Sequence, residues 1–521
     1  MDLLRQYIYD LHYDTDKVKP PDWEVDWDDA PLPFKLYRGN ESIPLSTDVP
    51  LTIREARHGP PDLRTVSHML WYTYGITQYG ELDGDADHFG YSARRFPPSG
   101  GALYPSELYV YLKLDSLPIG VYHYDAAHHR LILLREGRFD DYLDRATGCR
   151  ETMTNGFGAI FVSTMFWKNY YKYNNFSYRL QGLDAGAVMG QLLEAAKRFG
   201  FSSRVHYQYL DRAIHHLLGL NEMEESVYAV VTLSASPVIP PVSEKMFQVP
   251  DAADWEIARE LPPISNDVYV RSKRPKPFPM LIRMNAAARL ESTRFFRRGG
   301  NVPPEETGGL RVQLLPHANR LSYDFAEVCR KRYSPELEFR LGSVEESQVA
   351  ALLHESASSF SYQNDLDLDR EMKQHRVSLI GCYRGCQAIP DGAYRYDASL
   401  HALRQLRPGD HRNDLQRALT YPNVNLLQVP LCLHVAGEKD HLHKQLGYRG
   451  YRIEQMEAGM LVQRVLLTAT AMGMGARPLL GFDTRACERI YGIDNTPGTV
   501  LIQLPIGPCR PRARITSLLH A

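Results

Sequence analysis

The chain has 521 residues, enough for about two to four domains with full hydrophobic cores. Its 44% hydrophobic and 23% charged residues are ordinary for a globular protein, and the net charge of −2 argues against a nucleic-acid or membrane-surface partner. No apolar run reaches the roughly 18 residues of a membrane span, no signal-peptide pattern is present, and seven scattered cysteines suit a reducing compartment, so we expect a cytoplasmic protein without a metal site.

The first 55 residues are rich in Trp, Asp, Pro and Tyr and have no clear period. We therefore expect an irregular N-terminal arm that packs over a core. Residues 64–74 follow with a helical pattern in which apolar side chains share one face.

The stretch 94–109 reads RRFPPSGGALYPSELY and precedes a strand-like alternation over residues 107–113. Two prolines stiffen the chain just before Ser99, and the absence of Cβ atoms at Gly100 and Gly101 lets the backbone approach a ligand. Such a loop could lie flat against a planar ring and offer it N–H and hydroxyl donors. The alternative is an ordinary glycine-rich turn before a strand.

After a second apolar run at residues 157–167 comes Lys172-Tyr173. A helix is predicted over residues 183–199, because apolar side chains recur on one stripe, and a strand over residues 227–233. This mixture of strands and helices is typical of an α+β unit with a mostly antiparallel sheet.

The second half of the chain repeats the first. Residues 390–397 match residues 118–125 with an offset of 272, and Gly459 matches Gly186 with an offset of 273. An offset held this closely indicates a tandem duplication. The predicted parts are the arm at residues 1–55, a first domain at 56–234, a proline-punctuated connection at 235–308, and a second domain at 309–521.

The two copies differ in their candidate ligand-binding residues. The second copy lacks the Pro-Ser-Gly-Gly loop but has a glycine-rich turn and basic residues, which suit a phosphate through backbone N–H groups and charge-assisted hydrogen bonds. A solvated basic helix end and a basic C-terminus are the alternatives. The candidate phosphate ligands are Arg330, Arg332, Ser334, Gly475, Arg477, Gly481, Arg510 and Arg512.

The sequence PSGGALYPSELY at residues 98–109 resembles the flavin-ring loop of the SagB-type peptide dehydrogenases, a nitroreductase-like family that aromatises thiazolines and oxazolines in peptides. The resemblance covers most of residues 10–233 and 325–507 and implies a tandem nitroreductase-like α+β fold. Since such proteins usually build each FMN site between two subunits, it implies a covalent pseudo-dimer with one intact FMN site. The implied ring-side residues are Arg94, Pro98, Ser99, Gly100 and Gly101.

In this family a Lys-Tyr pair at the place of Lys172 and Tyr173 acts on the azoline ring. One hydrogen must leave Cα as a proton and another must leave Cβ as a hydride, which FMN would accept. A neutral Tyr is a poor base because its pKa is near 10. We expect the Lys172 ammonium to lower that pKa and Tyr173 to act as the base. The alternative is a Lys-Tyr pair in an ordinary tyrosine-rich loop.

The sequence therefore predicts an FMN-dependent dehydrogenase that oxidises peptide thiazolines or oxazolines to thiazoles or oxazoles. Its partners would be an azoline-bearing peptide, cyclodehydratase subunits of a modifying complex, and O2 as electron acceptor. Two alternatives remain open. One is another flavoenzyme reaction on the same scaffold, such as NAD(P)H-dependent reduction or desaturation of another substrate. The other is a scaffold subunit without redox activity.

Overall fold

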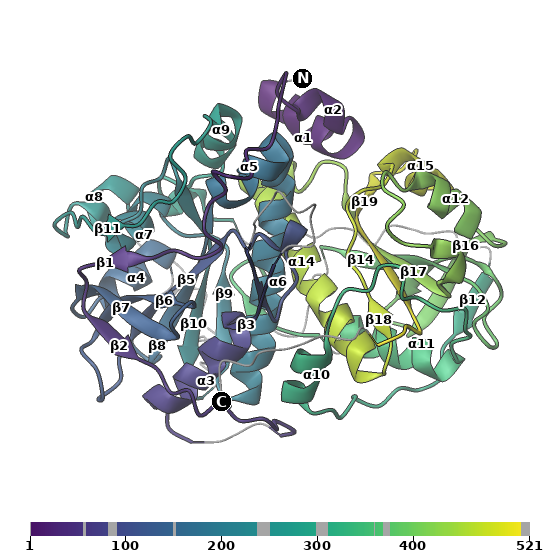
Figure 1. Cartoon of the computed structure of the whole chain (residues 1–521), viewed down its shortest axis with the longest axis horizontal. Helices are drawn as coiled ribbons and strands as arrows, with labels where there is room; N and C mark the ends of the chain where they lie inside the picture. Colours follow the sequence, from purple (N-terminus) through teal and green to yellow (C-terminus); the bar gives the residue numbers. More distant parts are fainter. Residues whose placement is uncertain are drawn as a thin grey trace.

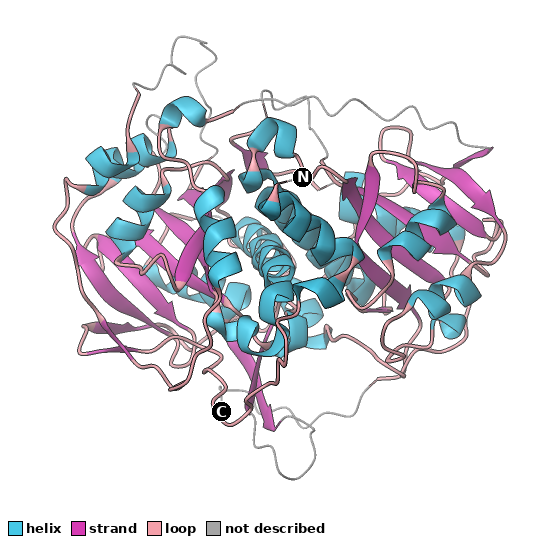
Figure 2. Cartoon of the chain, turned by 90° about the horizontal axis from the view of Figure 1, so that it is seen from above, coloured by secondary structure: helices cyan, strands magenta, loops and turns pink. Residues whose placement is uncertain are grey.

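The computed structural model describes residues 2–55, 59–81, 91–148, 153–236, 251–297, 311–358, 360–367 and 376–511. Two α+β halves lie side by side, each with its own sheet, and two long helices run between them (Figures 1 and 2). Over these ranges no helix is both long and apolar enough to cross a membrane. The predicted ligand Arg512 lies outside the described residues.

The first half is built on an eight-stranded sheet in the order β13-β9-β10-β8-β5-β6-β7-β2, antiparallel except for the β13–β9 pair. Its interior strands β5 and β10 are buried along their whole length, including the polar residues Glu107 and Glu225. The strands are β2 (Ser42–Pro44), β5 (Ser106–Leu112), β6 (Gly120–Asp125), β7 (Arg130–Glu136), β8 (Gly158–Met165), β9 (Ser202–His206), β10 (Glu225–Ser234) and β13 (Gln363–Asn364). A separate hairpin pairs β3 (Ile76–Glu81) with β4 (Tyr91–Arg95).

The second sheet has the order β12-β16-β15-β14-β17-β19-β18. Six strands repeat the first sheet in order, with β18-β19-β17-β14-β15-β16 matching β9-β10-β8-β5-β6-β7. A register shift at Val121/Tyr122 recurs at Ala393/Tyr394. The strands are β12 (Arg311–Leu314), β14 (Ser378–Tyr383), β15 (Gly392–Asp397), β16 (Ala402–Pro408), β17 (Leu431–Glu438), β18 (Gly475–Ala476) and β19 (Gly498–Gly507). The predicted tandem α+β duplication is confirmed.

Helices cover the sheets and separate the two halves. The first half and its arm contain α1 (Leu3–Tyr13), α2 (Thr15–Val18), α3 (Leu63–Tyr74), α4 (Asp140–Thr147), α5 (Trp167–Tyr173), α6 (Ser177–Arg198) and α7 (Asp211–Leu218). The second contains α10 (Phe325–Lys331), α11 (Glu346–Leu353), α12 (Arg412–Ala418), α13 (His443–Leu446), α14 (Tyr448–Ala471) and α15 (Thr484–Tyr491). Helix α6 begins six residues before the predicted start at Leu183.

The two halves meet along α6 and α14, which pack closely because each has a glycine at the crossing. A Cβ atom on Gly186 would come within 2.1 Å of the Met456 carbonyl oxygen, and one on Gly459 within 2.2 Å of the Leu183 carbonyl oxygen. Repeated glycines therefore mark the pseudo-twofold contact between the halves.

Gly459→Val should destabilise the whole chain. Its side chain has to displace the backbone of α6, and overpacking of this kind costs about 1–3 kcal/mol or more. The urea midpoint of unfolding would measure the loss. Gly59→Val is the control, since nothing lies within 4 Å of the Gly59 Cβ position and its φ is not in the left-handed region. Equal losses in the two variants would contradict this role of Gly459.

Reciprocal hydrogen bonds also join the halves. Arg179 on α6 donates to the Leu501 carbonyl on β19 at 2.6 Å, and its repeat equivalent Arg452 on α14 donates to the Val227 carbonyl on β10, also at 2.6 Å. Each half therefore supplies a backbone carbonyl that accepts a hydrogen bond from a buried arginine of the other half, as the subunits of a dimer can do.

The connection predicted at residues 235–308 is folded over its described part, 251–297. It forms α8 (Asp254–Ala258), β11 (Asp267–Val268) and α9 (Pro279–Ala287), and β11 pairs with β1 (Tyr37–Arg38) of the arm. The arm and α9 pack together in one apolar cluster with α5 and α14. These segments belong to the body of the protein and fix the position of α5.

Candidate functional site

A cavity of about 1340 Å³ lies between the halves and is lined by residues of both. This volume exceeds the roughly 300–1,000 Å³ of a typical small-molecule site, so it has room for a second ligand beside a first. From the first half come the loop after β4, the end of α5 and one face of α6. From the second come the end of α10 and the turns after α12 and β18.

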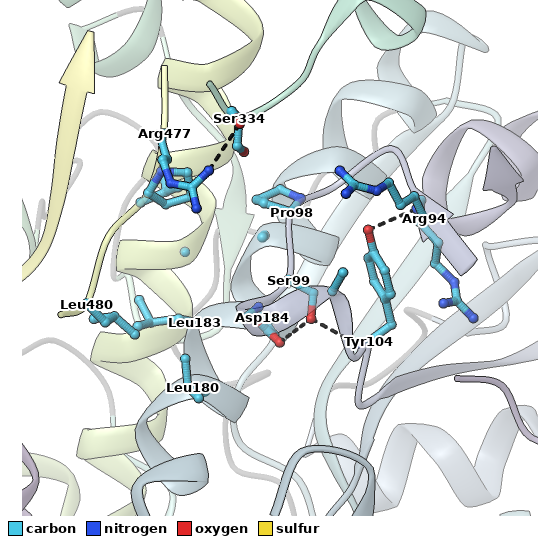
Figure 3. A pocket seen from close by; sticks show the side chains of 18 of the residues that line it. Arg94, Pro98, Ser99, Tyr104, Leu180, Leu183, Asp184, Ser334, Arg477 and Leu480 are labelled. Atoms are coloured by element: carbon cyan, nitrogen blue, oxygen red, sulfur yellow. Dashed lines mark hydrogen bonds between the residues drawn. The ribbon is translucent and has the colours of Figure 1, made fainter. Parts of the chain in front are cut away.

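The predicted ring loop lies on one wall of the cavity (Figure 3). The Ser99 hydroxyl donates to Asp184 Oδ2 at 2.7 Å, and the Gly100 N–H donates to Asp184 Oδ1 at 3.1 Å. The Tyr104 N–H in turn donates to Ser99 Oγ at 2.9 Å. One buried carboxyl group on α6 thus holds the loop in position.

Side chains of α5 and α6 lie close to the glycines of this loop. A Cβ atom on Gly100 would lie 2.8 Å from Leu180 Cδ2. Gly101 has a φ of 63°, and its Cβ would lie 2.5 Å from the Tyr173 hydroxyl oxygen. The backbone therefore passes directly beneath the predicted catalytic pair, which the sequence alone could not reveal.

Lys172 and Tyr173 end the short helix α5, and Asn174 stops the helix with a φ of 45°. Both side chains line the cavity. The Lys172 Nζ lies 5.3 Å from the centre of the Tyr173 ring and 5.3 Å from that of Trp27 in the arm. A helix end thus brings these neighbours to one side, whereas a strand would have pointed them apart.

Helix α5 is itself anchored to the strand that follows the ring loop. Lys168 forms an ion pair with Glu107 on β5, and both side chains are almost fully buried. Glu107 also accepts a hydrogen bond from the Lys35 N–H at 3.0 Å and contacts His123 Nε2 at 2.8 Å. This buried network fixes α5 relative to the loop and so fixes Lys172 and Tyr173.

The expected lowering of the Tyr173 pKa is wrong. Burial raises the pKa of Tyr173 well above 10, and the neighbouring Asp184 adds to the increase. Burial also lowers the pKa of the Lys172 ammonium. Desolvation opposes the charged form of both groups, so burial shifts Lys172 and Tyr173 toward their neutral forms.

The opposite wall carries the basic residues of the second half. Arg477 Nη1 donates to the Ser334 carbonyl at 3.1 Å, Arg332 Nε donates to the Phe96 carbonyl at 2.7 Å, and Arg330 Nη1 donates to the Leu51 carbonyl at 2.8 Å. All three arginines line the cavity, and the Arg332 bond joins this wall to the ring loop.

The cavity brings most of the predicted site residues together and leaves some apart. Those that line it are Arg94, Pro98, Ser99, Gly100, Gly101, Lys172, Tyr173, Arg330, Arg332, Ser334, Arg477 and Gly481. Gly475 does not line it, because it packs against Cys509 and Pro335, where a Cβ would lie 2.7 Å from the Cys509 Sγ. Arg510 is exposed outside the lining, with its N–H bonded to the Glu338 carbonyl.

Comparison with known proteins identifies the family. The sequence pattern of the nitroreductase family matches residues 52–233 and 386–508, one region in each half. The chain belongs to the nitroreductase family. The duplicated regions of the fold are therefore two nitroreductase domains in one polypeptide.

A crystal structure described as a nitroreductase from Anabaena variabilis ATCC 29413 has the same tandem fold, with a TM-score of 0.75 and 21% identity over 97% of this chain and 99% of that one. The trifolitoxin-processing protein TfxB of Rhizobium leguminosarum bv. trifolii is 25% identical over 36% of this chain. MJ1384 of Methanocaldococcus jannaschii, described as a nitroreductase, is 25% identical over 24%. The matched regions span 48% and 61% of these two relatives.

In this tandem nitroreductase the equivalent second site is filled over its described residues. Glu457, which follows Asp184 by 273 residues, forms an ion pair with Arg376 at 2.5 Å and accepts a hydrogen bond from Tyr362 at 2.7 Å. Arg204, which precedes Arg477 by the same 273, donates to the Asn364 carbonyl where β13 pairs with β9. Over the described residues, protein contacts thus engage Glu457 and Arg204, whose equivalents Asp184 and Arg477 line the cavity at the first site.

Asp184 is the functional residue that sequence reasoning missed. It lies on α6 in the stretch LDAGAVM at residues 183–189, where it is the one charged residue among small and apolar ones. A single acidic residue in such a stretch was the signal that the sequence offered. Its repeat equivalent is also acidic, but Glu457 is neutralised by Arg376, whereas no ion pair with Asp184 occurs in the described ranges. Only the folded structure distinguishes these two carboxyl groups.

Proposed function

We propose that this nitroreductase binds one FMN in the cavity and oxidises azoline rings of a peptide to azoles. The observation that carries the proposal is the meeting of the glycine loop and the Lys172–Tyr173 pair at one wall, with three arginines opposite. The trifolitoxin-processing name of one relative supports a peptide substrate. Cyclodehydratase partners and O2 as electron acceptor belong to the same proposal.

The residues present fit FMN. A cradle without Cβ atoms at Gly100 and Gly101 suits the flat isoalloxazine ring. Arg332 and Arg477 suit the phosphate, and the Arg477 Nε is buried without a hydrogen-bond partner among the described residues. Bound FMN would supply a hydride acceptor.

The chain's own residues would handle the proton. The Lys172 side chain, whose ammonium pKa burial lowers, would act as the amine base that takes the Cα proton of the azoline. Tyr173, whose hydroxyl stays protonated, would donate a hydrogen bond to the substrate and orient its ring. The nearby Trp27 ring would stabilise the resulting ammonium by a cation–π contact.

Purified protein tests the proposal directly. We expect a yellow protein that releases one FMN per chain on denaturation, because the equivalent second site is filled. Mixing with an azoline peptide should bleach the flavin, and air should restore the colour with release of hydrogen peroxide. Bleaching by NAD(P)H but not by azoline peptides would favour a reductase, and a colourless folded protein would favour a scaffold role.

Arg477→Ala should weaken FMN retention about 10- to 100-fold, because a charge-assisted hydrogen bond contributes roughly 1.5–3 kcal/mol. Equilibrium dialysis of the apoprotein against FMN would measure it. The matched control is Arg204→Ala, at the repeat-equivalent position in the filled site. Equal weakening by both substitutions would indicate two functional sites, and no weakening by either would remove Arg477 from the phosphate site.

A further inference from the structure

Asp184 is a buried carboxyl group that accepts two hydrogen bonds from the ring loop. Burial raises its pKa to about 7 despite these two donors. The titratable groups that face it are Tyr74 of α3 and Tyr173 of α5, both uncharged at neutral pH. Two basic groups lie beyond them, Arg95 over the Tyr74 ring and Lys172 beside Gly101.

Ser99 connects this carboxyl group to the cavity. A serine hydroxyl has one hydrogen to donate and two lone pairs. One lone pair accepts the Tyr104 N–H. When Asp184 is ionised, the hydroxyl hydrogen is donated to it, so Ser99 can only accept a hydrogen bond from a ligand. When Asp184 is protonated, its O–H can donate to Ser99 Oγ instead, and the serine hydrogen becomes free to point into the cavity.

We propose that Asp184 is a proton-controlled positioning residue that decides whether Ser99 offers the bound flavin a hydrogen-bond donor or an acceptor. This inference rests on the proposed flavin site. The rim of an oxidised isoalloxazine ring carries several acceptors, two carbonyl oxygens and ring nitrogens, and one N–H donor. The donor state of Ser99 therefore matches the ring better, and protonated Asp184 favours its binding.

FMN affinity of the apoprotein, measured by quenching of flavin fluorescence between pH 5.5 and 8.5, tests the proposal. One hydrogen bond gained or lost changes affinity by roughly 3- to 10-fold. In the wild-type protein the dissociation constant should rise by this factor as the pH increases. Asp184→Asn should bind tightly across the range, because its amide N–H donates to Ser99 Oγ at every pH. Ser99→Ala should also lose the pH dependence.

Asp254→Asn is the matched control. Asp254 lies on α8 outside the cavity and likewise accepts two hydrogen bonds, in its case from the backbone N–H groups of Arg212 and Ala213. Burial raises its pKa to about 6. This variant should keep the wild-type flavin profile. A wild-type slope that survives in Asp184→Asn, or a slope of opposite sign, would overturn the inference while leaving the flavin site itself intact.

Unfolding in urea gives a second readout that needs no flavin. The folded-state pKa of Asp184, about 7, lies above the roughly 3.9 of an unfolded aspartate. The contribution of this carboxyl group to the free energy of unfolding therefore falls as the pH rises between these two values. Asp184→Asn should remove this part of the decline in the urea midpoint. An unchanged decline would overturn the inference even if the protein bound no flavin at all.

Discussion

Lys172→Ala should leave a folded, yellow protein whose azoline oxidation is about 10²–10⁴-fold slower, the usual effect of losing a general base. Rapid mixing with an azoline peptide, followed by flavin bleaching, isolates this step. The wild-type rate should increase with pH as the Lys172 ammonium is deprotonated, and burial moves that increase below the usual value near 10.5. The variant should lack this pH dependence.

Two further variants sharpen this test. Lys276→Ala is the control, because Lys276 lies over the Trp23 ring at 4.3 Å in a similar cation–π contact but does not line the cavity. Tyr173→Phe, which removes a neutral hydrogen-bond donor, should slow bleaching by only roughly 2- to 10-fold. A loss in Tyr173→Phe as large as that in Lys172→Ala would instead favour Tyr173 as the base.

Gly101→Val should abolish both the yellow colour and the turnover. The new side chain meets the Tyr173 hydroxyl, at 2.5 Å from the Cβ position, and the Lys172 Nζ, at 3.2 Å. A valine at this left-handed position therefore has to displace the Lys172–Tyr173 pair or the ring loop, and either change alters the cavity wall. The flavin absorption of the purified protein and its peroxide release would report the effect.

Gly39→Val controls for the backbone cost. Gly39 has a φ of 75°, close to that of Gly101, but nothing lies within 4 Å of its Cβ position. Both variants lose roughly 1–2 kcal/mol of stability because a non-glycine residue has to adopt the left-handed conformation. Only the Gly101 variant also meets neighbouring side chains. Normal colour in the Gly101 variant would mean that the loop does not support the flavin.

The duplication and the ring loop were predictable because both are local or repeated patterns. Gly186 and Gly459 revealed the repeat, and the structure shows that they mark the contact between the halves. The filled second site was not predictable, since β13 has two residues and pairs with a strand far away in the sequence. The direction of the Tyr173 pKa shift was not predictable either, because burial in the folded protein raises this pKa. The lysine next to Tyr173 in the sequence does not indicate how deeply the tyrosine is buried.

Because both halves belong to one chain, their two sites can differ in sequence, whereas the sites of a symmetric dimer cannot. In a homodimer every substitution appears twice, so a change that fills one site fills the other as well. Here Asp184 and Glu457 are encoded separately, and one lines an open cavity while the other forms a buried ion pair with Arg376. A substitution at either position can therefore change one half of the protein and leave the sequence of the other half as it was.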